Sequence, residues 1–71
     1  MEVSARNQIP GAVKAINPGA TLAEVIIGTD SGEVVAIVTR GSIEHLSLKV
    51  GDPVFAVIKA TEVMVAKEHK C

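Results

Sequence analysis

The chain has 71 residues, with seven Lys and Arg against eight Asp and Glu, so its formal net charge is -1. Hydrophobic residues make up 48% of the chain and aromatic residues 1%, the single Phe55, which predicts one small domain over residues 1–71. The near-neutral charge speaks against nucleic-acid binding, and no apolar run reaches the ~18 residues of a membrane span. The single cysteine cannot form an intrachain disulfide and the start has no signal-peptide pattern, so we expect a cytoplasmic protein.

The apolar residues favour β-structure. The chain has eleven Val and seven Ile but three Leu. Side chains branched at Cβ, such as Val and Ile, suit a pleated sheet better than a helix. Apolar runs separated by Gly, Pro, Asn and Asp predict five strands. In chain order these cover residues 12–16, 21–29, 33–39, 54–59 and 62–66, and an extended arm over residues 3–9 precedes them, ending at Pro10-Gly11.

The connections between these strands carry turn residues. Turns are predicted at Asn17-Pro18-Gly19, Asp30-Ser31-Gly32 and Val50-Gly51-Asp52-Pro53, because glycine supplies the positive φ that tight turns need. Ser42 is predicted to cap a short helix that ends at Leu46. Five strands with one short helix between the third and fourth predict an all-β fold, the five-stranded Greek-key barrel called the OB-fold.

The third and fourth strands are apolar on both faces. Val34, Ala36 and Val38 alternate with Val35 and Ile37. The fourth strand places Val54, Ala56 and Ile58 opposite Phe55 and Val57. One face fills the barrel and the other needs a cover, either long surface side chains or a second subunit. Since a chain of this length buries a modest core, we predict self-association.

No catalytic or metal-binding pattern is evident. His45, His69 and Cys71 lack the spacing of transition-metal ligands, and the glutamates form no acid–base pair. No glycine-rich phosphate loop is present either. We therefore predict a protein that is not an enzyme and that holds no metal through its side chains.

Two polar segments could bind an anion. In an extended arm, Ser4, Arg6 and Gln8 project to one side and can all donate hydrogen bonds. Lys59 adds an ammonium where the fourth strand passes into the fifth. The alternatives are a solvated arm and a lysine that merely covers apolar surface.

The sequence resembles a known family. Four stretches carry the resemblance: Ser-Ala-Arg-Asn-Gln before Pro-Gly, Val-Val-Ala-Ile-Val-Thr, Leu-Ser-Leu-Lys-Val-Gly-Asp and Ile-Lys-Ala-Thr-Glu-Val-Met. They are similar to the molbindins, the small molybdenum-pterin-binding proteins (Mop), whose TOBE-type domain also occurs in molybdate-responsive regulators and transporter ATPases. The resemblance extends from about Val3 to Ala66.

The resemblance implies an OB-like homohexamer, a trimer of dimers, with molybdate or tungstate bound between subunits for molybdenum storage. By motif position, Ser4, Ala5 and Arg6 would contact the oxyanion, Asn7 would hold the arm, and Lys59 and Ala60 would reach it from a neighbouring chain. Regulators of the family often have Ser where this chain has Ala60, so Ala60 offers its N–H alone. A second anion site near the threefold axis is also implied, with Thr39, Gly41 and Ser42 as candidates.

Three other functions stay open at this point. An OB-fold nucleic-acid binder would stack bases on aromatic side chains, of which this chain has one. A purely structural oligomerisation domain would bind no anion. A carrier of molybdopterin is suggested only by the family's older name.

Overall fold

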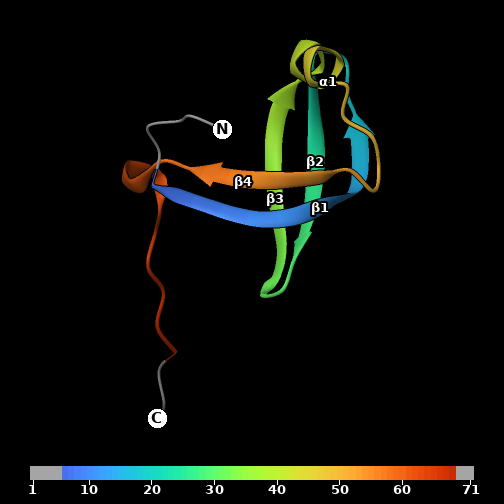
Figure 1. Ribbon diagram of the computed structural model, residues 1–71. Helices are drawn as coiled ribbons and strands as arrows, with labels where there is room; N and C mark the ends of the chain where they lie inside the picture. Colours follow the sequence, from blue (N-terminus) through green and yellow to red (C-terminus); the bar gives the residue numbers. More distant parts are fainter. Residues whose placement is uncertain (1–5, 69–71) are drawn as a thin grey trace.

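The computed structural model describes residues 6–68, which form one curled antiparallel sheet with a short helix (Figure 1). In chain order the elements are β1 (Asn7–Pro18), β2 (Leu22–Thr29), β3 (Gly32–Thr39), α1 (Arg40–Leu46), β4 (Pro53–Ile58) and the 3-10 turn η1 (Ala60–Glu62). The strand order in the sheet is β3-β2-β1-β4. The predicted all-β class, with its helix between the third and fourth strands, is confirmed.

The long strand β1 belongs to both halves of the sheet. Its first half pairs with β4, from Asn7 opposite Ile58 onward, and its second half pairs with β2, as far as Pro18 opposite Ala23. A register shift between Val13 and Ala15 marks a bulge, which bends the strand. As a result the β1–β4 pair runs crosswise to the β2–β3 pair, the curl of a small barrel (Figure 1).

The prediction of an arm that ends at Pro10-Gly11 before a strand starting at Ala12 is wrong, because β1 is continuous from Asn7. At Pro10 the strand pairs only with β4, since its pairing with β2 begins at Ala12, and such an edge stretch tolerates proline. Gly11 is needed because a Cβ there would collide with the carbonyl oxygen of Gly28. Pro-Gly therefore marks a close crossing of strands here, and not a break.

The core lies inside the curl. Val13, Val25, Ile27 and Ala56 form a buried cluster. Half-buried residues pack against it, namely Ile16, Val34, Ala36, Val38, Ile43, Leu48 and Val54. The predicted faces are confirmed, since Val35 and Ile37 point outward with 55% and 62% of their surface exposed, as do Phe55 and Val57.

Helix α1 begins at Arg40, and Thr39 caps it in place of Ser42, three residues earlier than predicted. The Ser42 N–H donates to Thr39 Oγ1 over 3.0 Å, and the two hydroxyl oxygens lie 2.8 Å apart. Thr39 also ends β3 in extended conformation (φ -75°, ψ 152°), the geometry that an N-cap needs. The predicted turns at Gly32 and Gly51 are confirmed by their positive φ values of 121° and 96°.

Removing this cap tests how much α1 contributes to the fold. We expect Thr39→Ala to lower the free energy of unfolding by about 1 kcal/mol, the usual effect of losing an N-cap hydroxyl. Urea unfolding at fixed protein concentration measures the difference. Ser31→Ala is the control, because the Ser31 side chain is exposed in the β2–β3 loop and its loss should change stability little. Equal stability of Thr39→Ala and the parent chain would contradict the capping role.

The predicted fifth strand over residues 62–66 is wrong for the described chain. The Glu62 N–H donates to the Lys59 carbonyl over 2.9 Å and closes η1, and residues 63–68 then leave the sheet without pairing. Figure 1 shows this segment running away from all four strands. A strand needs a neighbouring edge to satisfy its backbone, and the direction of η1 gives the segment none. The barrel therefore stays open between β3 and β4.

Candidate functional site

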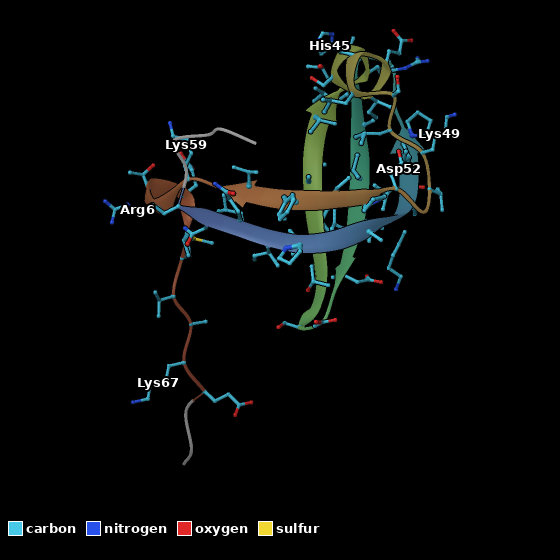
Figure 2. All side chains as sticks on the ribbon, viewed as in Figure 1. Arg6, His45, Lys49, Asp52, Lys59 and Lys67 are labelled. Carbon is cyan, nitrogen blue, oxygen red and sulfur yellow. The ribbon has the colours of Figure 1, made fainter. Side chains whose placement is uncertain are left out.

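The end of the β1–β4 pair brings two sequence-predicted residues together. Asn7, the first residue of β1, pairs with Ile58, the last of β4. Arg6 and Lys59 directly flank this pair, and Figure 2 shows both at the same end of the molecule. Antiparallel pairing of β1 and β4 thus brings to one end of the sheet two cations that lie near opposite ends of the sequence.

Both cations are exposed and neither is neutralised within the described chain. The one ion pair found across residues 6–68 joins Lys14 and Glu33, 2.7 Å apart. Glu62 follows Lys59 by one 3-10 turn, but no ion pair joins the two. The charge of Arg6 and Lys59 is therefore available to an external anion.

Backbone and amide donors lie beside these charges. Ala60 opens η1, and the first N–H groups of a helical turn have no acceptor within it. Asn7 is half-buried and held by its pairing with Ile58, so it can fix the course of the chain next to Arg6. Ser4 and Ala5, the other two predicted contacts, lie outside the described residues.

This group of donors suits an anion with several acceptor oxygens. A guanidinium, an ammonium and backbone N–H groups donate hydrogen bonds and carry no acceptor on those atoms. A dianion held by two exposed side chains would remain in contact with water, so full enclosure requires a second surface. The sequence-based expectation placed Lys59 on a neighbouring chain, whereas here Arg6 and Lys59 of one chain already share an end of the sheet.

The candidates for the second anion site lie elsewhere. Thr39, Gly41 and Ser42 gather at the start of α1, away from Arg6 and Lys59 (Figures 1 and 2). The hydroxyls of Thr39 and Ser42 bond each other and the helix cap, while Gly41 is open to solvent. The second anion site stays a prediction.

Groups typical of metal sites are not gathered in the part of the chain that the structure describes. Residues 6–68 contain no cluster of three His, Cys, Asp or Glu side chains that could hold a metal ion. His45 lies exposed on α1, and His69 and Cys71 are beyond the described range. Among the described helices, none has the length and apolar character needed to cross a membrane.

One feature of the surface was not predicted from the sequence. An apolar groove of about 520 Å³ lies between β3 and β4. Val13, Val25 and Ile27 are among the residues that line it, and so are Lys59 and Glu62. The alternating pattern of β3 and β4 predicted two apolar faces. It contained no information on whether the backbone edges of these two strands are paired.

Comparison of the sequence and the fold with those of known proteins identifies the family of this chain. The TOBE domain model matches residues 3–65. Molybdenum-pterin-binding protein 3 of Clostridium pasteurianum is 44% identical over 66 residues, which cover 92% of this chain and 97% of that protein. The solved molybdate-binding protein of Sporomusa ovata superposes with a TM-score of 0.88 at 39% identity, covering 94% of this chain and 100% of the other.

A third relative has the same fold within a longer chain. The cytoplasmic molybdate-binding protein ModG, solved with molybdate bound, superposes with a TM-score of 0.78 at 43% identity, over 84% of this chain and 43% of its own. The family model spans nearly all of the sequence, and the C. pasteurianum and S. ovata relatives are matched over almost their whole length. The chain therefore belongs to the TOBE-domain family, among its molybdenum-pterin-binding (Mop) proteins.

Proposed function

We propose that this protein binds molybdate or tungstate at subunit interfaces of a homo-oligomer and stores the oxyanion in the cytoplasm. Arg6 and Lys59 neutralise the dianion, while Ser4, Ala5, Asn7 and Ala60 donate hydrogen bonds or hold the chain in place. Binding is the whole mechanism, so no bond is made or broken and no molybdopterin is required.

The observation that carries the proposal is the meeting of Arg6 and Lys59 at the open end of the β1–β4 pair without a carboxylate partner among the described residues. Two positive charges match the charge of a deprotonated tetrahedral dianion. Relatives named for molybdate binding support the choice of ligand, and one of them is described as cytoplasmic.

Titration calorimetry with molybdate tests the proposal, together with mass spectrometry for molybdenum and tungsten in the protein as purified. We expect saturable binding of either oxyanion. A protein that takes up neither oxyanion but shifts a labelled single-stranded nucleic acid at low salt would refute the proposal and favour a nucleic-acid-binding OB-fold.

Self-association is a separate expected result. Val35, Ile37, Phe55 and Val57 expose apolar surface on the outside of β3 and β4, and water contact with this surface is unfavourable. We expect light scattering at micromolar concentration to give six times the chain mass of 7.4 kDa, a hexamer built as a trimer of dimers. A mass of 7.4 kDa would contradict both the assembly and a site between subunits.

A further inference from the structure

One carboxylate lies beside the proposed anion site. Among residues 6–68, Glu62 is the acidic residue closest in sequence to either cation of the site, three positions after Lys59. The Glu62 N–H donates to the Lys59 carbonyl over 2.9 Å. Lys59 is the N-cap of η1 and Glu62 is its third residue, the position from which a glutamate side chain turns back toward the cap. Lys59 and Glu62 are therefore neighbours in space as well as in sequence.

The Glu62 side chain has no part in holding the described fold together. It is exposed, and within residues 6–68 no hydrogen bond or ion pair holds its carboxylate. By contrast, Glu33 pairs with Lys14 and the Asp52 carboxylate accepts the Lys49 N–H. An acidic residue can stabilise the first turn of a helix through its dipole, but η1 has three residues and little dipole to stabilise.

The charge of Glu62 acts on the site with opposite sign to that of the two cations. Arg6 and Lys59 supply two positive charges and Glu62 one negative, which leaves a local net charge of +1. An ionised carboxylate offers acceptors only, so it cannot donate a hydrogen bond to a deprotonated oxyanion. Without ligand it offsets the repulsion between the cations, whereas a bound anion is repelled by it. Both effects lower the affinity of the site.

We propose that Glu62 sets the affinity of the oxyanion site, because its carboxylate repels the bound dianion through space and allows its release. The inference rests on the proposed function and adds to it the residue that limits binding. Coulomb energy is proportional to the charge of the ligand, so a dianion is repelled twice as strongly as a monoanion of the same shape. Glu62 thereby also narrows the preference of the site for dianions.

Removing the charge of Glu62 tests this role. We expect Glu62→Gln to lower the Kd for molybdate by about three- to tenfold, the scale of one charge that acts through water on a dianion. Glu62→Ala, which adds no amide donor, should give a similar gain. Glu62→Asp keeps the charge and should stay within about twofold of the parent chain, since the interaction changes gradually with distance.

A matched control removes the same charge elsewhere. Glu44 is exposed on α1 beside His45, at a different end of the molecule from Lys59 (Figure 2). We expect Glu44→Gln to change the Kd by less than about twofold, because a remote exposed charge is screened. Titration calorimetry measures all four variants, and circular dichroism and light scattering check their fold and assembly.

The charge of the ligand separates repulsion from a change of shape. Perrhenate is a tetrahedral oxyanion of nearly the same size as molybdate with a single negative charge. The repulsion it experiences is half as large, so a tenfold gain for molybdate in Glu62→Gln corresponds to a gain of about threefold for perrhenate. Competition calorimetry against bound molybdate measures the perrhenate affinity. The gain for molybdate should also shrink as sodium chloride is raised, because salt screens exposed charges.

The other outcomes decide against the proposed role of Glu62. Equal gains for molybdate and perrhenate, or no gain in Glu62→Gln and Glu62→Ala while the parent chain binds molybdate, would remove the repulsion and leave the proposed function standing. Weaker binding in Glu62→Gln with loss of the assembly by light scattering would mean that the carboxylate pairs with a cation of a neighbouring copy. A parent chain that binds no oxyanion would remove the proposed function, and this inference with it.

Discussion

Arg6→Ala is expected to weaken molybdate binding by about 2 kcal/mol, roughly thirtyfold in Kd, the scale of a lost charge-assisted hydrogen bond. The fold should be unaffected, because Arg6 is exposed and precedes the first paired residue of β1, Asn7. Calorimetry gives the change in Kd, and urea unfolding checks that stability is preserved.

Lys59→Ala should have an effect of similar size for the same reason, since Lys59 is exposed and follows the last residue of β4. Lys49→Ala removes an equal charge from the far side of the molecule (Figure 2) and is expected to change Kd by less than about twofold, the effect of a remote, screened charge. Light scattering shows whether each variant still assembles. Unchanged affinity in both Arg6→Ala and Lys59→Ala would place the site elsewhere.

Local patterns predicted the β2–β3 hairpin well. Both strands were placed within one residue of their observed bounds, Leu22–Thr29 and Gly32–Thr39. Alternation along each strand and the positive φ of Gly32 are properties of neighbouring residues, so the sequence alone contains the signal. The same holds for β4, which begins directly after the turn at Gly51-Asp52.

Elements that depend on distant partners were harder to predict. β1 continues through Pro10 and Gly11 because β4 and β2 pair with its two halves, and no local pattern reports that. The residues of the expected fifth strand have high β-propensity, yet propensity does not specify which edge a strand joins. Here the 3-10 turn η1 at Ala60–Glu62 directs the segment away from the strand edges of its own chain.

The candidate site shows the same division between what local sequence predicts and what depends on distant parts of the chain. Composition and spacing suggested an anion at Arg6 or at Lys59 separately, and only the family resemblance joined the two. The structure supplies the physical link, since the Asn7–Ile58 pair holds both cations at one end of the sheet. The same end of the sheet carries the 3-10 turn η1, which begins directly after Lys59.

We expect selectivity for the larger oxyanions, because the sheet holds the backbone positions of Arg6 and Lys59 at one end. The backbones that carry Arg6 and Lys59 continue into paired strands, which limits how far the donors can move inward. Molybdate and tungstate have the same charge and shape and nearly the same size, and we expect each to displace the other equally well.

Sulfate carries the same charge but has shorter bonds to oxygen, so several donors would be left at stretched distances, where hydrogen bonds weaken. A loss of about 1 kcal/mol at each of two or three hydrogen bonds gives a preference of roughly a hundredfold for molybdate. Competition calorimetry, with sulfate or tungstate titrated against bound molybdate at constant ionic strength, measures this ratio directly, and tungstate serves as the matched control. If sulfate displaced molybdate at equal concentration, Arg6 and Lys59 would form a generic anion patch, because donors able to follow a smaller ion cannot discriminate by size.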